Sequence, residues 1–375
     1  MRNKSVAVLD IRSSEICAAV GERGVNNTFI IKSKYSCAYD GFAEGALLDE
    51  ESFDSAVYEA VKNTLSAYGE RIKTFYIGVP DEFIKVVNTD KVLSFASPKK
   101  ITGAHVESLV NLSRPKDTDD YTAIKRSALY YVLPDKRRVI DPVGAVANSL
   151  RGVFGFYLCK KSFVHSLLNA FKKFGGIKNL NLIPQCYAQA MYLISPERRD
   201  GYAVLFDMGY ISSSYTVVCG NGVAFSEAFS VGVGHVAALL MNELDIPFEA
   251  ADYFVKKINL NAKERLMVIE EYKCGGKVYS FSNSVLRDLV REGLDGICET
   301  LEECRNSFTG KNLSGKTLFV TGEGIKTIRG AAEHLSSRLV SAVDVIAPNV
   351  PYYDKPQFSS LFSLLWAALG ERSRI

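Results

Sequence analysis

YAVLFDMGYISSSYTVV, residues 202–218, is predicted to be a β-hairpin with one charge inside it. An apolar strand from Tyr202 ends at Asp207, and a second apolar strand runs from Tyr215 to Val218. The turn between them carries a glycine and a row of serines. A lone carboxylate beside glycine and hydroxyls at a strand end suits a hydrated metal ion or a phosphate.

The N-terminus repeats this design in SVAVLDIRSSEICAAV, residues 5–20. An apolar strand ends at Asp10, a short turn carries Ser13 and Ser14, and a second apolar strand follows. Any α/β protein can end a strand in aspartate, but here the hydroxyl turn recurs as well. The repeat therefore predicts two similar domains that face one cleft, each presenting an aspartate hairpin.

The composition narrows the class of protein. The chain has 375 residues, 47% of them hydrophobic and 23% charged, which is typical of a globular protein with a sizeable core. A net charge of +3 is too small to indicate nucleic acid or an anionic membrane as a partner. Eight scattered cysteines without a CxxC motif indicate reduced thiols and a cytoplasmic location, and four distant histidines disfavour a His-based metal site or triad.

Two segments interrupt the expected domains. Residues 82–161 are predicted to be a small α+β insertion with short strands, because Lys and Asp become frequent there. Residues 246–308 are expected to be mostly helical, with a short strand pair at 267–279. A helix at 163–174 is expected to end at Gly175–Gly176.

The C-terminal third adds two features. A buried strand at 317–321 is followed by Gly322-Glu-Gly-Ile325, where the backbone amides at a helix start suit an anion or a nucleotide edge, although a tight turn is equally expected. Residues 358–369 form an amphipathic helix. Its polar face lacks basic residues before Arg372, so docking on the core is favoured over lying on a membrane surface.

The order of these motifs resembles the superfamily of actin, the ATP-driven heat-shock chaperones and the sugar kinases, and more closely the bacterial cell-division family FtsA. The most FtsA-like local features are VLP at 132–134, DPVG at 141–144 and VGVGH at 231–235. The resemblance implies an α/β fold of actin-like (ribonuclease H-like) duplicated domains around a central nucleotide cleft, with an FtsA-type inserted subdomain. It implies four subdomains, which are 1A (1–81, 162–200 and 350–375), 1C (82–161), 2A (201–245 and 309–349) and 2B (246–308).

The same resemblance supplies the expected site. ATP and Mg²⁺ would be bound with Asp10 and Asp207 holding the metal through water, and these two would also be the catalytic residues of an active enzyme. The expected cofactor-binding residues are Asp10, Ser13, Ser14, Asp207, Gly209, Ser212, Ser213, Gly322 and Gly324.

Departures from the family pattern weaken this site. The family's first loop reads Asp-Ile-Gly-Thr-Thr-Lys, whereas this chain has Arg12 at the glycine and Glu15 at the lysine. The second loop, usually Asp-Ile-Gly-Gly-Gly-Thr-Thr-Asp, has Tyr210 and Ile211 at two glycines. The family's water-positioning Glu before proline is here Ile183. Since the loss of one positioned catalytic group usually costs orders of magnitude in rate, we expect a degenerate ATPase in which ATP and Mg²⁺ binding is weak or lost.

The expected function is an FtsA-like scaffold at the division septum that binds the FtsZ C-terminal tail and self-associates into an oligomer or filament. The tail would dock on segment 246–308 at Arg287, Arg291 and Arg305, where a solvated helix face is the simpler interpretation. FtsA proteins continue beyond the last core helix to a membrane-targeting helix. This sequence ends at Ile375, so recruitment to the inner face of the membrane is expected to be indirect or to use a segment absent here.

Two alternatives remain open at this point. One is an active Mg-ATP-dependent ATPase of the same fold, with the serines of both turns contacting phosphates. The other is a pilus-type or other actin-fold assembly factor, which requires a partner other than FtsZ. A sugar or acid kinase is disfavoured, because no acidic base loop follows the first subdomain.

Overall fold

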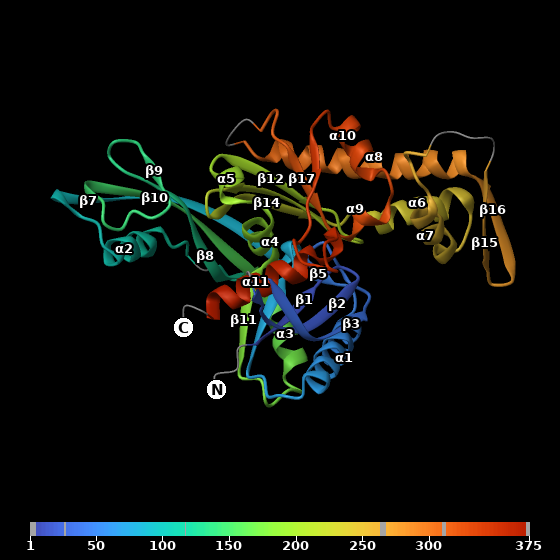
Figure 1. Cartoon of the computed structure of the whole chain (residues 1–375), viewed down its shortest axis with the longest axis horizontal. Coiled ribbons are helices and arrows are strands. Elements are labelled where there is room, and N and C mark those ends of the chain that lie inside the picture. Colours follow the sequence, from blue (N-terminus) through green and yellow to red (C-terminus); the bar gives the residue numbers. More distant parts are fainter. Residues whose placement is uncertain (1–4, 26–27, 117, 263–267, 310–312, 373–375) are drawn as a thin grey trace.

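The computed structural model describes residues 5–25, 28–116, 118–262, 268–309 and 313–372. The described chain forms a lower half and an upper half, each built around a five-stranded sheet, and a long insertion projects from their junction (Figure 1).

The lower half is built on the sheet β11-β6-β1-β2-β3. Its strands are β1 Val6–Ile11, β2 Glu15–Arg23, β3 Phe29–Ala38, β6 Thr74–Val79 and β11 Asn179–Pro184. Alternate residues of β1 point to opposite faces, so Ala7 and Leu9 join one core cluster and Val6 and Val8 join another. The helices α1 Glu50–Tyr68 and α3 Lys161–Phe171 cover the first face, and α11 Ser359–Arg372 covers the second.

The upper half repeats the same topology in the sheet β18-β17-β12-β13-β14. Its strands are β12 Tyr202–Asp207, β13 Ser213–Cys219, β14 Gly222–Phe229, β17 Leu318–Thr321 and β18 Val343–Val345. In each half, three antiparallel strands that follow one another in the chain are extended by two parallel ones. The duplicated α/β fold predicted from the two aspartate hairpins is therefore confirmed.

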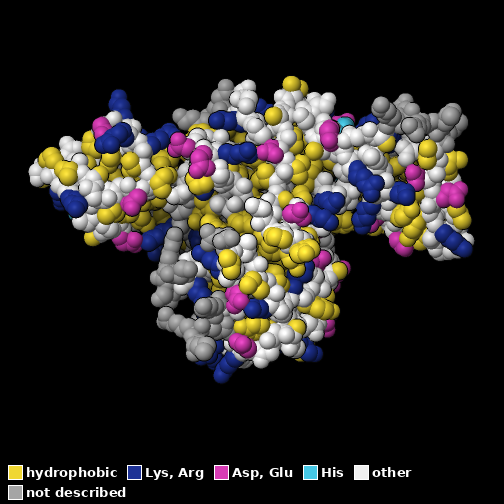
Figure 2. Space-filling view, viewed as in Figure 1, with side chains coloured by type: hydrophobic (Ala, Val, Ile, Leu, Met, Phe, Trp, Pro, Cys, Tyr) yellow, Lys and Arg dark blue, Asp and Glu magenta, His cyan; other side chains and the backbone are white. Residues whose placement is uncertain are grey.

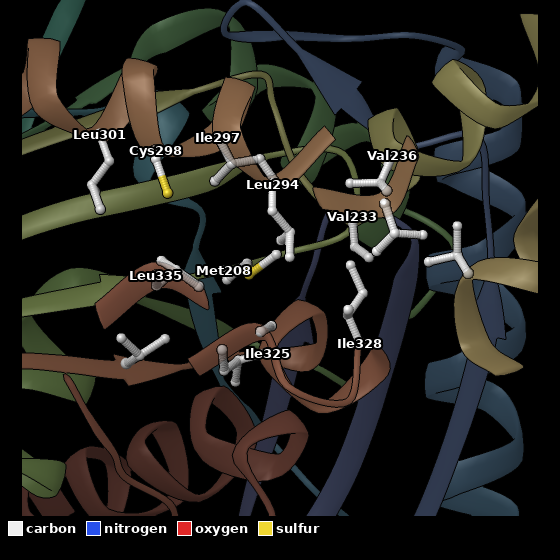
Figure 3. Packing of buried hydrophobic residues seen from close by; sticks show 14 of the residues in the cluster. Met208, Val233, Val236, Leu294, Ile297, Cys298, Leu301, Ile325, Ile328 and Leu335 are labelled. Atoms are coloured by element: carbon white, nitrogen blue, oxygen red, sulfur yellow. The ribbon is translucent and has the colours of Figure 1, made fainter. Parts of the chain in front are cut away.

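Helices pack around the upper sheet. These are α6 Val233–Leu244, α7 Phe248–Lys257, α8 Asn283–Ser307, α9 Glu323–Thr327 and α10 Ala331–Arg338. Figure 3 shows Met208 among Leu294 of α8, Ile325 of α9 and Leu335 of α10. Met208 is fully buried, so the residue that follows Asp207 fixes the second aspartate turn in the core.

The insertion contains the longest strands of the described chain, and the expectation of short strands there was wrong. It consists of β7 Ile84–Lys100, α2 Gly103–Ser113, β8 Tyr121–Val132, β9 Arg138–Val139 and β10 Val146–Lys160, with the sheet order β7-β10-β8-β9. We call this sheet with α2 the inserted arm. The frequent Lys and Asp are explained by its narrow shape, because a thin arm exposes much of both strand faces to solvent.

The remaining helices and strands that were predicted are present, but their ends differ from the prediction. A strand pair, β15 Ile269–Cys274 with β16 Lys277–Ser282, lies next to α7, while the start predicted at residue 267 lies outside the described residues. Helix α3 ends at Phe171, so Gly175–Gly176 is not its cap. Short elements complete the fold: β4 Phe42–Ala43, β5 Ala46–Leu47, η2 Asp81–Phe83, α4 Gln185–Leu193, α5 Pro196–Arg199 and η3 Pro356–Phe358.

The last helix, α11, docks on the core as favoured from its polar face. Ten of its side chains are buried, among them Leu361, Phe362 and Leu365. Within the described ranges, no helix is both long and apolar enough to cross a bilayer.

Candidate functional site

The two aspartate turns meet at the junction of the halves. Asp10 is the penultimate residue of strand β1 and Asp207 is the last residue of strand β12, and the two strands hold equivalent positions in the two sheets. The turns touch directly, since the backbone N–H of Ile211 donates to Ser13 Oγ at 3.1 Å. The sequence repeat thus located a real junction between the halves.

Asp10 is almost fully buried, and its hydrogen bonds come from neutral groups. Gln185 Nε2 donates to Asp10 Oδ1 at 3.0 Å, and Ser360 Oγ donates to the same oxygen. The nearest cation is Arg12, whose Nε lies 3.6 Å from Asp10 Oδ2. Burial raises the pKa of Asp10, while Arg12 and the Ser360 hydrogen bond oppose this shift.

Asp207 lies in the equivalent turn but is less completely covered, and fewer groups oppose the upward shift of its pKa. Gln189 Nε2 donates to Asp207 Oδ2 at 2.6 Å. Burial raises the pKa of Asp207 to about 7, with further upward contributions from Asp81, Glu323 and Asp10, and the Gln189 hydrogen bond opposes it. A neutral amide therefore takes one carboxylate oxygen of each aspartate.

Arg12 connects the halves. Its guanidinium forms ion pairs with Glu15 of its own turn and, at 3.4 Å, with Glu323 at the start of α9. Ser14 Oγ also donates to Glu323, at 3.1 Å. Burial acts to lower the pKa of Arg12, but the three carboxylates of Asp10, Glu15 and Glu323 outweigh it and raise that pKa.

Tyr210 and Ile211, the residues at two family glycines, occupy space in the junction. Tyr210 lies against Gly234, where a Cβ would come within 3.0 Å of the tyrosine ring, and its hydroxyl donates to Asp252 Oδ1 at 3.0 Å. Ile211 lies next to Gly41, where a Cβ would come within 2.8 Å of the isoleucine side chain. Both side chains fill positions that glycines would leave open.

The second turn uses its polar groups internally. Ser213 Oγ accepts from the N–H of Gly209 at 3.2 Å and donates to the carbonyl of Val231 at 2.7 Å. Gly322 has a φ of +98°, and a Cβ there would lie 2.3 Å from Asp207 Oδ1, so this position requires glycine. Gly324 also packs on this turn, with its N–H bonded to the carbonyl of Met208 at 2.8 Å.

These contacts leave a cavity of about 60 Å³, lined by both turns together with Asp81, Gln185 and Glu323. Sites for nucleotide-sized ligands are commonly about 300–1,000 Å³. The protein's own side chains therefore leave little space between the two aspartate turns.

The structure brings together all the residues expected to bind the cofactor. Asp10, Ser13, Ser14, Asp207, Gly209, Ser212, Ser213, Gly322 and Gly324 lie on the two turns and the start of α9. Sequence reasoning did not assign roles to Gln189, Glu323 or Ser360, and it treated Arg12 only as bulk. The placement of Gln185 and Gln189 on one face of α4, four residues apart, was a usable signal.

The three arginines expected to bind a partner do not form one patch. Arg287 is buried and donates to the backbone carbonyls of Asn259 and Ala262, so it cannot face a docked peptide beside Arg291 as expected. Arg291 pairs with Asp288 at 3.2 Å and stays partly exposed. Arg305 lies apart, on a small apolar cavity.

Comparison with known proteins supports the fold. No family model matches the chain. Curated relatives include the cell division protein FtsA of Staphylococcus epidermidis, 19% identical with 96% of this chain and 78% of the relative covered. Another is FtsA of Streptococcus pneumoniae, 22% identical with 95% and 78% covered.

Solved structures align over nearly the whole chain. A PilM–PilN type IV pilus biogenesis complex matches with a TM-score of 0.66 at 14% identity, covering 98% of this chain and 99% of that one. This chain has the actin-like ATPase fold. MreB5 of Spiroplasma citri bound to AMPPNP matches at 0.58 and 10% identity, covering 100% and 98%, and a MamK double helical filament matches at 0.56 and 12%, covering both chains fully.

Proposed function

We propose that this chain is an actin-fold scaffold of the FtsA type that holds a division partner and self-associates, with weak or absent ATP hydrolysis. Relatives named FtsA that align along most of the chain support the division role. The observation that carries the proposal is Arg12, a cation in the first turn whose ion pair with Glu323 holds the two halves together across the junction.

The chemistry of the junction disfavours Mg-ATP. A hydrated Mg²⁺ is held by carboxylate oxygens that accept from its water ligands, and glutamine amides here already occupy one oxygen each of Asp10 and Asp207. A triphosphate would also meet Glu15 and Glu323, and like charges at such distances repel strongly in a site away from bulk water. These residues do not fit the cofactor, so we derive no hydrolysis step.

Ion pairing instead closes the junction without a ligand. The Arg12 guanidinium supplies the positive charge that a bound metal would otherwise bring to the acidic turns, and Ser14 adds a second contact to Glu323. On this proposal the closed arrangement is the resting state of the scaffold, and the partner recognises that closed surface.

We propose further that the chain divides into the four subdomains 1A, 1C, 2A and 2B given above. The FtsZ C-terminal tail would dock on 2B near Arg291, and recruitment to the division site would follow from that contact. Self-association would use the inserted arm, which exposes the apolar side chains Val92, Leu112, Ile140, Val143 and Val146. Figure 2 shows hydrophobic side chains gathered on this arm.

The proposal that ATP binding and hydrolysis are weak or absent is tested by calorimetry with Mg-ATP and by measuring phosphate release. We expect neither binding heat nor turnover from the native chain. The matched variant carries Arg12→Gly, Glu15→Lys, Tyr210→Gly and Ile211→Gly, which restores the family residues, and it should gain binding. Micromolar affinity together with turnover in the native chain would refute the proposal and establish the active ATPase alternative.

The proposed binding of the FtsZ C-terminal tail is tested by fluorescence anisotropy with a labelled tail peptide. Arg291→Glu should weaken binding about tenfold, whereas Arg126→Glu on the remote inserted arm should not.

A pilus-type assembly factor is the second candidate, favoured by the alignment with the PilM–PilN complex over 98% of the chain. Binding of a PilN-type peptide without binding of the FtsZ tail would select that candidate.

A further inference from the structure

A second and larger cavity lies at the junction, on the face of the lower sheet that α11 covers. Its volume is about 330 Å³, within the usual size range of small-molecule sites. Strands β2 and β3 contribute Glu15 and Lys34, and α9 contributes Glu323 and Lys326. Arg12, Glu323 and Gln357 line both cavities, so this one adjoins the smaller space between the aspartate turns at the Arg12–Glu323 ion pair.

The two lysines of this cavity form no ion pair with a carboxylate among the described residues. Lys34 and Lys326 come from opposite halves and both are exposed, and neither takes part in any of the ion pairs between described residues. Lys34 Nζ lies 5.4 Å from the ring centroid of Phe358 and 6.0 Å from that of Tyr353, and the faces of the two rings attract this amine. The mouth of the cavity therefore offers two ammonium groups to an anion.

The inner wall has the opposite character. Glu15, Glu323 and the buried Asp10 share the single cation Arg12, which leaves the wall with excess negative charge. An ammonium group placed against this wall would therefore be attracted by its excess negative charge.

We infer that this cavity binds a small zwitterion of the α-amino-acid type. Its carboxylate lies between Lys34 and Lys326 at the mouth, and its ammonium group faces Glu15 and Glu323. With its six charged side chains ionised the lining has no net charge, but its charges are separated. A neutral ligand with separated charges matches this pattern, whereas a dianion would be repelled by the inner carboxylates.

This inference goes beyond the scaffold function and does not depend on which partner is bound. Because the two lysines belong to different halves, the ligand would add one more link across the junction. Ligands that bind only the native arrangement raise the stability of the protein by mass action.

The test is a ligand titration of the full chain, with glycine and L-alanine as probes and with acetate, ethylamine and inorganic phosphate as comparison compounds. Saturation-transfer NMR gives the dissociation constants. We expect the zwitterions to bind at least about tenfold more tightly than the three comparison compounds. Lys34→Met and Lys326→Met should each weaken zwitterion binding by about tenfold, and Lys277→Met, on the remote strand β16, should leave it unchanged.

Three results would overturn the inference: no zwitterion binding at millimolar concentration, phosphate or acetate binding as tightly as glycine, or glycine binding unaffected by both methionine variants. Thermal unfolding of each variant without ligand identifies any folding defect. Because both lysines are exposed, we expect native unfolding curves. If one variant is unstable, the other still decides the outcome.

Discussion

Replacing Arg12 by alanine removes the one cation that the three carboxylates of the junction share. Breaking a buried ion pair by removing one partner typically costs about 3–5 kcal/mol. The side chains of Arg12, Glu15 and Glu323 are 20%, 36% and 22% exposed, so solvent screens part of that cost. We therefore expect Arg12→Ala to lower the free energy of unfolding by about 2–3 kcal/mol at pH 8.

The pH dependence of this destabilisation shows whether it comes from the lost charge or from lost packing. Without Arg12, the carboxylates of Asp10, Glu15 and Glu323 repel one another in the folded state, and protonation relieves that repulsion. The difference in free energy of unfolding between the native chain and Arg12→Ala should therefore become smaller as the pH falls from 8 to 5. A deficit caused by lost packing alone would stay constant over this range.

The measurement is urea unfolding followed by the fluorescence of Trp366, the single tryptophan, which lies in α11 beside the junction. Arg126→Ala is the matched control, because its ion pair with Glu107 lies on the exposed surface of the inserted arm. It should change the stability by less than about 0.5 kcal/mol. A deficit for Arg12→Ala no larger than that of the control, or one independent of pH, would show that the ion pairs do not hold the halves together.

Further predictions concern the second turn. Burial raises the pKa of Asp207 from an ordinary 3.8 to about 7, so the native state binds more protons than the unfolded state between these values, and its stability should fall as the pH rises from 4 to 7. Asp207→Asn should reduce this dependence of the free energy of unfolding on pH, as measured by urea unfolding at several pH values. If the dependence is unchanged, groups other than Asp207 cause it. Gly322→Ala should destabilise by more than the roughly 1–3 kcal/mol of left-handed backbone strain, because the new Cβ also meets Asp207. Gly315→Ala, at a φ of +72° with no atom within 4 Å, should show the strain alone, and equal losses would count against the clash.

Local patterns predicted the fold well where each strand has one clear role. In β1 and β12 an apolar run ends at a single aspartate, and the recurrence of that pattern exposed the duplication. The inserted arm was harder to predict, because β7 is largely exposed along most of its length and lacks the alternation that marks a half-buried strand.

The sequence predicted where the turns of the site lie, but it did not predict which side chains form hydrogen bonds with the two aspartates. Asp10, Asp207 and Gly322 could be placed from the motifs they end or follow. The partners of the aspartates come from elsewhere in the chain: Gln189 from α4 and Ser360 from α11. Their contacts depend on how these helices dock on the sheets, which single-sequence patterns do not specify.

The base of the inserted arm acts as a brace. The N–H of Val223 donates to the Tyr157 hydroxyl at 3.1 Å, and the N–H of Asn221 donates to the carbonyl of Leu129 at 3.1 Å, so strands that emerge from the lower sheet are fastened to the edge of the upper one. Swinging the halves apart would have to break these bonds or bend β10. Fifteen residues of strand give the arm a reach of roughly 50 Å. A protein that grips its tip would therefore apply torque, with long leverage, to the joint that keeps the molecule shut.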